Sequence, residues 1–559
     1  MENTTTLFEI SWEICNKVGG IYTVITSKEN VINSKIKNYY QVGPFIENSK
    51  NYFIKKPMND KMQKANEILN SIGINFVYGT SKFNEKINVI LVEYLGYSQN
   101  INNIKSKLWE HYKIDSLNTD WYDFDEAILW SWCCGKVIEE ISKQITQPED
   151  KVLIHAHEWM SGGAIFYTNL NSNKQNHNNK TQKRDSKYKT IFTTHATILG
   201  RSLSQNNINL VDEIQTLDPN EYSYKMGVST KHQTEKALAN ICDCFTTVSN
   251  TTNQEACFFY SKSADILLYN GFNNEKITDL EILNSKYYKS RKNTNQLLKN
   301  IFSKIPNFNV DKTKIFYTSG RNEFKNKGFD IYIKSLSKLN DQLISEDSEI
   351  TLINFFLVPI GDYETINLNK VDEIPLKTHC ICNHEILNEL EKNGLQNCPG
   401  DKVFNILVPK YLDGNDGVIN KKYYEFISGF DLGVFPSFYE PWGYTPLESI
   451  SYAVPTITSD MSGFGKHIQR SYGDFNPAVM VLKRTQLNEK RQVEKLYELL
   501  YDQLKRNQKS QILQREFAKV TALKYDWKIF VDNYIKAYEI ALNKNSKNKN
   551  NKHKHGEHN

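Results

Sequence analysis

Residues 435–448 read Phe435-Pro436-Ser437-Phe438-Tyr439-Glu440-Pro441-Trp442-Gly443-Tyr444-Thr445-Pro446-Leu447-Glu448, directly after an apolar, strand-like run at 431–435. Thr445 is a good N-cap, Pro446 suits the first helical position, and Glu448 stands three residues after the cap, so the pattern predicts a capping box. Gly443 lets a ligand approach the backbone closely, and Glu440 places a carboxylate beside the free N–H groups of the helix start. Strand, loop, glycine and helix start in this order indicate a sugar-phosphate or nucleotide pocket at the carboxyl end of a sheet. The alternative is a plain strand–turn–helix connection with a solvated Glu440.

Two halves of the chain each alternate strand-like runs with helix-like segments. The expected strands are residues 7–13, 89–94, 152–159, 191–196 and 244–250 in the first half, and 314–321, 353–358, 404–408, 432–435 and, last, 454–458 in the second. This alternation predicts an α/β protein with two Rossmann-like, doubly wound domains facing a cleft.

The expected boundaries follow composition. Residues 1–283 are expected to form an N-terminal Rossmann-like domain and residues 284–525 a C-terminal one, with a polar, Lys-rich stretch at 284–312 just after the boundary. Residues 526–543 have an amphipathic pattern and are expected to form a final helix that packs back on the first domain. Residues 544–559 are rich in Lys, Asn and His and are expected to be disordered.

Length and charge limit the function. A chain of 559 residues is too long for one core, and its 39% apolar and 24% charged residues are ordinary for a globular protein. The net charge of +5, from 69 basic and 64 acidic residues, does not support a nucleic-acid-binding body. Neither a signal peptide nor an apolar run of membrane-spanning length is visible, so we expect a cytoplasmic protein with no membrane partner.

The candidate metal ligands are the pairs Cys242/Cys244 and Cys380/Cys382 and the histidines His155 and His157. Neither cysteine pair has a matched second pair at zinc-site spacing, and the histidines have no evident third ligand nearby. The ordinary interpretation is incidental thiols, with one histidine packed and one exposed. No metal and no cofactor are predicted.

Three further stretches have alternative interpretations. Lys17-Val18-Gly19-Gly20 follows the first strand, where two glycines permit close approach of a phosphate or sugar, although many such turns carry glycines. Residues 171–189 have few apolar side chains and predict an exposed insertion. The basic residues of the helical segment 504–524 are expected to form a solvated face, with an anion site as the alternative.

Several motifs in order resemble the glycogen synthases of the animal and fungal type, which are glycosyltransferases of the GT-B fold. They lie at residues 8–24, 155–159, 192–201, 320–328, 435–448 and 461–465, with a weaker echo at 511–527. The resemblance implies a retaining, metal-independent enzyme that moves glucose from UDP-glucose to the non-reducing end of an α-1,4-glucan. The implied partners are UDP-glucose and glycogen or a malto-oligosaccharide, with a homo-oligomer left open.

The resemblance also implies residue roles. Arg201, Arg321 and Lys327 would neutralise the diphosphate, and Glu440 would stabilise oxocarbenium-like charge on the donor glucose. The remaining substrate-binding candidates are His157, His195 and Asn270 for the sugar, Gly443, Tyr444 and Thr445 for the phosphates, Glu448 for the ribose, Tyr423 for stacking on uracil, and Lys17, Gly19 and Gly20. Glu448 serving only the capping box, and Tyr424 replacing Tyr423, are the alternatives.

The chain also departs from that family. Where those enzymes bind glucose 6-phosphate on an arginine-dense helix, residues 506–515 here are diluted with Lys, Gln and Ser, and little room is left for terminal phosphorylation segments. Other functions remain open: the same fold using ADP-glucose or making another glucan, or a glucan-binding scaffold without catalysis.

Overall fold

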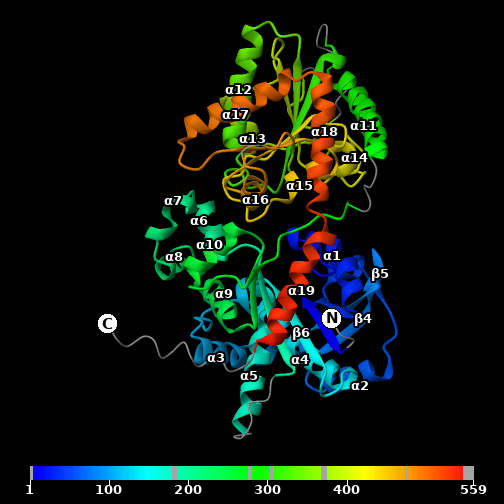
Figure 1. Cartoon of the computed structure of the whole chain (residues 1–559), viewed down its shortest axis with the longest axis vertical. Coiled ribbons are helices and arrows are strands. Elements are labelled where there is room, and N and C mark those ends of the chain that lie inside the picture. The colour runs from blue at the N-terminus through cyan, green and yellow to red at the C-terminus, as the bar shows by residue number, and fades with distance from the viewer. Residues whose placement is uncertain are drawn as a thin grey trace. The chain divides into compact units, whose positions relative to one another are not determined.

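The computed structural model describes residues 4–178, 186–274, 280–302, 308–366, 374–473 and 475–544. Two compact α/β units are present, and Figure 1 labels their elements. The first takes in Met1–Leu203, Ile214–Gly271 and the C-terminal segment from Trp527; the second takes in Ser204–Glu213 and Phe272–Asp526. The chain therefore changes unit after Gly271, earlier than the predicted boundary at 283/284. Phe272 N–H donates to Tyr525 O at 2.8 Å, which ties the start of the second unit to its end.

The first unit is built on a nine-stranded sheet of order β3-β4-β5-β2-β1-β6-β7-β8-β9. Its strands are β1 Thr5–Ile10, β2 Asn38–Pro44, β3 Phe53–Lys55, β4 Asn75–Ser81, β5 Asn84–Glu93, β6 Lys151–His157, β7 Tyr188–Thr194, β8 Cys244–Thr247 and β9 Ile266–Leu267. Pairing is parallel from β5 through β9 and antiparallel at the β3-β4-β5 edge. All six residues of β1 are buried, as expected for a central strand covered on both faces.

Helices of the N-terminal half connect these strands. They are α1 Gly20–Lys35, α2 Asp60–Asn70, α3 Ile101–Tyr112, α4 Glu126–Ile145, α5 Gly163–Asn178, α6 Ile198–Gln205, α7 Leu210–Glu213, α8 Pro219–Lys225, α9 Ser229–Ile241 and α10 Asn250–Phe259. The last helix, α19 Trp527–Asn543, packs against α1, β7 and β8 of the first unit (Figure 1). Its buried side chains recur along one face, at Trp527, Val531, Tyr534, Tyr538 and Ala541.

The second unit is built on a six-stranded, fully parallel sheet of order β12-β11-β10-β13-β14-β15. Its strands are β10 Thr313–Ser319, β11 Thr351–Leu357, β12 Val403–Val408, β13 Leu432–Val434, β14 Thr456–Ser459 and β15 Val479–Leu482. Its helices are α11 Leu280–Ile301, α12 Phe329–Ser345, α13 Glu385–Lys392, α14 Tyr423–Ile427, α15 Tyr444–Ser451, α16 Gly463–Tyr472, α17 Glu489–Lys505 and α18 Gln508–Leu523. The expected doubly wound fold is therefore confirmed.

One prediction for the second half was wrong. The run at 454–458 is not the last strand, because β15 pairs with β14 at the sheet edge; four residues are too few for a clear periodic signal. The polar stretch 284–312 is largely the 22-residue helix α11. Leu283, Leu298 and Ile301 are buried on it, and this sparse apolar stripe is hidden among Lys and Asn residues.

The basic face expected at 504–524 is only partly solvated. Arg515 is buried: its guanidinium lies 4.0 Å from the ring centroid of Tyr287 and donates to backbone carbonyls of Ser428 and Phe430. Lys519 is also buried and bonds Asn274 Oδ1 at 3.3 Å. These two cations therefore hold the fold of the second unit.

Other expectations fall on partly described regions. Helix α5 continues to Asn178 within the predicted insertion, and residues 179–185 lie outside the described residues, as does the tail after Lys544. No helix among those described is both long and apolar enough to cross a membrane.

Candidate active site

The predicted catalytic residues of the second unit lie where its sheet changes direction. From β10 the chain adds β11 and β12 on one side, and β13, β14 and β15 on the other. The loop after β10 carries Lys327, and the loop after β13 carries Glu440. The Lys327 ammonium forms an ion pair with Glu440 Oε2, and the two side chains remain 12% and 21% exposed. Ligands of doubly wound sheets bind at such switch points, so the fold brings this pair to the expected place.

Arg321 lies in the same loop as Lys327 but makes a different contact. Its Nη2 is 2.8 Å from Glu323 Oε1, and its side chain is 55% exposed. A Cβ at Gly320 would lie 3.2 Å from the Cδ and Cε atoms of Lys327, so the missing side chain there leaves room for the lysine stem. The loop thus holds one largely buried cation, Lys327, and two exposed ones, Arg321 and Lys325.

The predicted capping box at Thr445 is wrong. Helix α15 begins at Tyr444, its N-cap is Gly443 at φ 113° and ψ 83°, and no side chain caps it. The left-handed conformation explains the glycine, because any side chain there would be strained. Thr445 and Pro446 consequently fall inside the first turn, and the N–H groups at the start of α15 are left without the predicted side-chain cap.

Glu448 forms a hydrogen bond within the second unit. Its Oε1 accepts a hydrogen bond from Tyr424 Oη at 2.7 Å, and the Tyr424 ring stacks on Tyr452 with centroids 4.7 Å apart. Tyr423 instead bonds Ser319 Oγ at 2.7 Å, at the end of β10. Both tyrosines therefore lie near the strand ends, and Tyr424 is the one that contacts Glu448.

In the first unit, the Gly19–Gly20 turn already holds a carboxylate. Glu13 Oε2 accepts from Gly19 N at 2.7 Å and from Tyr22 N at 2.9 Å, at the start of α1. Lys17 is exposed in the same turn. A second anion would have to compete with Glu13 for these donors, so the turn is a weaker phosphate site than its glycines alone predict.

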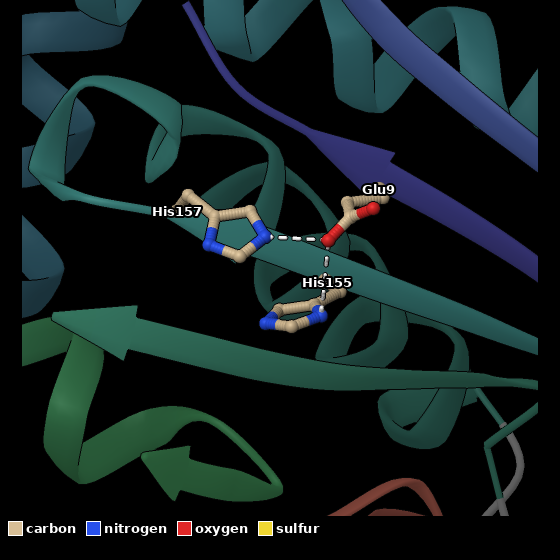
Figure 2. Close-up of side chains that lie close together, drawn as sticks. All are labelled: Glu9, His155 and His157. Atoms are coloured by element: carbon tan, nitrogen blue, oxygen red, sulfur yellow. Dashed lines mark hydrogen bonds and ion pairs between the residues drawn. The ribbon is translucent and has the colours of Figure 1, made fainter. Parts of the chain in front are cut away.

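The sequence missed the side chain that organises the predicted sugar-binding histidines. Glu9, the penultimate residue of β1, is fully buried and pairs with His155 of the neighbouring strand β6. His157 Nε2 lies 2.7 Å from Glu9 Oε1 (Figure 2). His157 Nδ1 lies 2.9 Å from His195 Nε2. The Lys28 ammonium and the Tyr39 hydroxyl also bond Glu9. The only sequence signal was a carboxylate inside an apolar strand.

Glu9, His155 and His157 together have the spacing of a metal site: their ligand atoms lie within 4.8 Å of one another. His155 Nδ1 is 3.8 Å from Glu9 Oε1 (Figure 2) but bonds Tyr538 Oη at 3.2 Å, while its Nε2 bonds Thr193 Oγ1 at 2.7 Å. A divalent ion would have to displace these partners and lie beside the buried Lys28 ammonium. The residues present do not fit a metal ion: Glu9 and His157 hydrogen-bond each other, and His155 is bonded to Tyr538 and Thr193 instead.

Glu158, next to His157, is strained. It has φ 65° and ψ 164°, a region that is essentially restricted to glycine. Its Oε1 accepts from His195 N at 2.8 Å and from Ala196 N at 3.2 Å, which links β6 to the turn after β7. Burial raises the pKa of Glu158 to about 7, against the lowering effect of Arg201. The strained residue thus holds the segment that leads to Arg201.

Two more buried carboxylates hold the same segment. Glu235 Oε2 accepts from Ile198 N at 3.0 Å, and Glu255 Oε2 accepts from Thr197 Oγ1 at 2.5 Å. Burial, and then the neighbouring Glu158, raise the pKa of Glu235 well above its usual range. Sequence reasoning missed both residues, because they come from α9 and α10 and no local motif marks them.

Asn270 precedes the passage into the second unit. It is buried, and its Oδ1 has no hydrogen-bond partner among the described residues. A buried amide oxygen without a partner costs stability, which is a common property of ligand-binding side chains.

Two doubly wound units, each with polar residues at the switch point of its sheet, make up the architecture of GT-B glycosyltransferases. Among solved structures, the chain is similar to the catalytic domain of starch synthase IV from Arabidopsis thaliana bound to ADP and acarbose. That match has a TM-score of 0.54 at 13% identity and covers 96% of this chain and 99% of the other. A UDP-forming α,α-trehalose-phosphate synthase from Burkholderia xenovorans matches with a TM-score of 0.53 at 12% identity, covering 96% and 99%. At these identities the likeness shows the fold alone.

The family model described as glycogen synthase matches residues 9–372 and 364–558, so the chain belongs to the glycogen synthase family. The chain is 27% identical over 606 residues to the glycogen [starch] synthase of Neurospora crassa, covering 96% of this chain and 84% of the relative. It is 28% identical over 631 residues to isoform 2 of Saccharomyces cerevisiae, covering 96% and 86%. The liver enzyme of Mus musculus is 26% identical over 604 residues, covering 96% and 83%.

Proposed function

We propose that this chain is a UDP-glucose-dependent glycogen synthase, which adds glucose to the non-reducing end of an α-1,4-glucan with retention of configuration and without a metal ion. The observation that carries the proposal is the Lys327–Glu440 ion pair at the switch point of the second sheet. It is supported by membership of the glycogen synthase family over almost the whole chain.

The proposed chemistry assigns each charge a task. The bond between glucose C1 and the diphosphate oxygen breaks, a bond from C1 to the acceptor 4-oxygen forms, and the acceptor proton passes to the leaving UDP. Lys327, Arg321 and Arg201 would stabilise the negative charge that develops on the diphosphate, so that no divalent ion is needed. Glu440 would stabilise the positive charge that develops at C1.

The other predicted side chains would bind the donor. His157, His195 and Asn270 would hydrogen-bond the sugar, and N–H groups at residues 443–445 would contact the phosphates. Glu448 would bind the ribose, with Tyr423 or Tyr424 stacking on the uracil. Lys17, Gly19 and Gly20 would contribute only if the ligand displaces Glu13 from the turn.

Incorporation of radiolabelled glucose from UDP-glucose into glycogen tests the proposal. E440Q and K327M should lower kcat by at least about 100-fold, the effect typical of removing one charge-stabilising group, while EDTA should leave the rate unchanged. E498Q and K495M are matched controls, because they remove charges from an exposed pair on α17 of the same unit. Full activity in E440Q would overturn the assigned role.

Donor choice, location and assembly belong to the same proposal. Parallel kinetics with UDP-glucose and ADP-glucose decide the nucleotide, and a higher kcat/KM with ADP-glucose would replace the proposed donor. Glucan binding without UDP release would favour a scaffold. A cytoplasmic location is tested by imaging of the tagged chain, and a homo-oligomer by sedimentation.

A further inference from the structure

We infer that Glu9 and Lys28 are positioning residues that fix the tautomers of His157 and His195, so that His195 presents Nδ1 as a hydrogen-bond acceptor to a hydroxyl of the donor sugar. The inference rests on the proposed function for the identity of the sugar. The tautomers themselves follow from the network inside the first unit.

The chain of bonds starts at an ionised carboxylate. Glu9 and Lys28 are both fully buried and paired with each other, and Glu9 also receives bonds from Tyr39 and His157. Burial raises the pKa of Glu9, but Lys28 and the His157 hydrogen bond lower it more, so the pKa lies well below its usual range. Glu9 is therefore a carboxylate that can only accept hydrogen bonds.

The proton positions then follow one by one. Because Glu9 only accepts, the proton of His157 is on Nε2, 2.7 Å from the carboxylate. Burial lowers the pKa of His157, so the ring is neutral and its Nδ1 carries a lone pair. His195 Nε2 lies 2.9 Å from that lone pair and must donate to it. Burial, followed by the nearby His157, lowers the pKa of His195 well below its usual range, so His195 is also neutral and its Nδ1 has no proton.

The series of hydrogen bonds ends at His195 Nδ1, and this atom is available to a ligand. His195 Nδ1 has no hydrogen-bond partner among the described residues, and the residue remains 8% exposed just after the carboxyl end of β7. A lone pair at this position binds a hydroxyl proton and repels a phosphate oxygen or an ether. It would therefore select for a donor group on the ligand, as sugar hydroxyls provide.

The Lys28 ammonium disfavours a doubly protonated, cationic His157. If His157 carried two protons, its cation would lie in a buried site already occupied by the Lys28 ammonium, next to one carboxylate. Removal of Glu9 or Lys28 alone would leave an unpaired buried charge, which is destabilising irrespective of any role in catalysis. The informative variant is the neutral double change E9Q/K28M.

Two measurements on the full-length protein test the inference. In protein labelled with 15N-histidine, imidazole 15N shifts should show both rings neutral at pH 7, with the proton on Nε2 of His157 and on Nε2 of His195. H157Q and H195Q assign the signals. A proton on His195 Nδ1, or a cationic ring, would overturn the inference even if no variant folds.

The second measurement compares UDP-glucose with its monodeoxy analogues. In the wild type, one analogue should lose about tenfold in kcat/KM, as expected for a lost hydrogen bond, and in E9Q/K28M this loss should shrink to about twofold. The matched control K105M/D125N removes another buried ion pair of the first unit and should keep the tenfold loss. Unchanged discrimination in E9Q/K28M would contradict the inference. No transfer from UDP-glucose by the wild type would instead refute the proposed function, while the 15N shifts would still decide the tautomers.

Discussion

Glu158 adopts a backbone conformation that is normally found only at glycine, so substitutions at this position should have an unusual effect on stability. At φ 65° and ψ 164°, any residue with a Cβ is strained by about 1 to 3 kcal/mol. Replacing Glu158 with alanine removes the carboxylate but keeps the strain, whereas replacing it with glycine removes both. We therefore expect E158G to be more stable than E158A, although glycine usually destabilises.

The size of the difference follows from two opposing effects. Both variants lose the hydrogen bonds from Glu158 to the His195 and Ala196 amides, so that loss cancels in the comparison. Relative to alanine, glycine stabilises the folded state by about 1 to 3 kcal/mol because the backbone strain is relieved. It lowers the stability by about 0.4 to 1 kcal/mol because the unfolded chain is more flexible at glycine. E158G should therefore exceed E158A in free energy of unfolding by about 1 kcal/mol at the middle of these ranges, and by at most about 2.6 kcal/mol.

Tryptophan emission during urea unfolding is a suitable assay, because seven of the eight tryptophans belong to the first unit. They are Trp12, Trp109, Trp121, Trp130, Trp132, Trp159 and Trp527. At equal slope, the E158G midpoint should lie at higher urea than the E158A midpoint. Glu67, exposed inside helix α2, is the control: there E67A should be more stable than E67G by about 1 kcal/mol. An E158A midpoint at or above that of E158G would refute the argument from strain.

Three other outcomes are expected. G200A should lower stability by about 1 to 3 kcal/mol, seen as a lower melting temperature, because a methyl group at this buried glycine would collide with Glu255; an unchanged melt would contradict the packing. Burial raises the pKa of Glu29 to about 7, so it binds a proton more readily folded than unfolded, and its contribution to stability falls as pH rises from about 4.5 to about 7. The stability of E29Q relative to the wild type should rise across that window and then level off. A difference in melting temperature between the two proteins that does not change with pH over this range would show that the pKa of Glu29 is not raised. Y424F should raise KM for UDP-glucose about 2- to 10-fold and change kcat by no more than about twofold, because Glu448 loses the hydrogen bond from the Tyr424 hydroxyl. An unchanged KM would show that this hydrogen bond does not contribute to binding of UDP-glucose.

Local patterns in the sequence determined the secondary elements that the fold needs most. Strands such as β1, β6 and β10 are short apolar runs bounded by turn residues, and their burial follows from a parallel sheet covered on both faces. The order of strand and helix then predicts two doubly wound units, and the rule for such sheets predicts polar residues at the strand ends. Glu440 could be proposed from residue type and position alone, whereas Lys327 was proposed from the family resemblance.

Predictions from local sequence patterns failed where a residue that is close in space, rather than in sequence, forms the contact. Glu448 has the spacing of a capping residue, yet Tyr424 bonds it and Gly443 starts the helix. Helix α11 has too few apolar residues for a clear period, and its stripe becomes visible only once the second sheet supplies a surface to cover it.

Tertiary structure alone decided what surrounds the histidines. Glu9 and His157 are 148 positions apart, and their contact arises because β1 and β6 are adjacent, in register, in one sheet. His195 joins them from the turn after β7, and Lys28 from α1. A sequence shows that each of these residues can donate or accept a proton, but only their distances in a buried site determine which of them does. The reason is physical: burial removes water as the alternative partner, so each proton must be shared with the side chain that the fold places beside it.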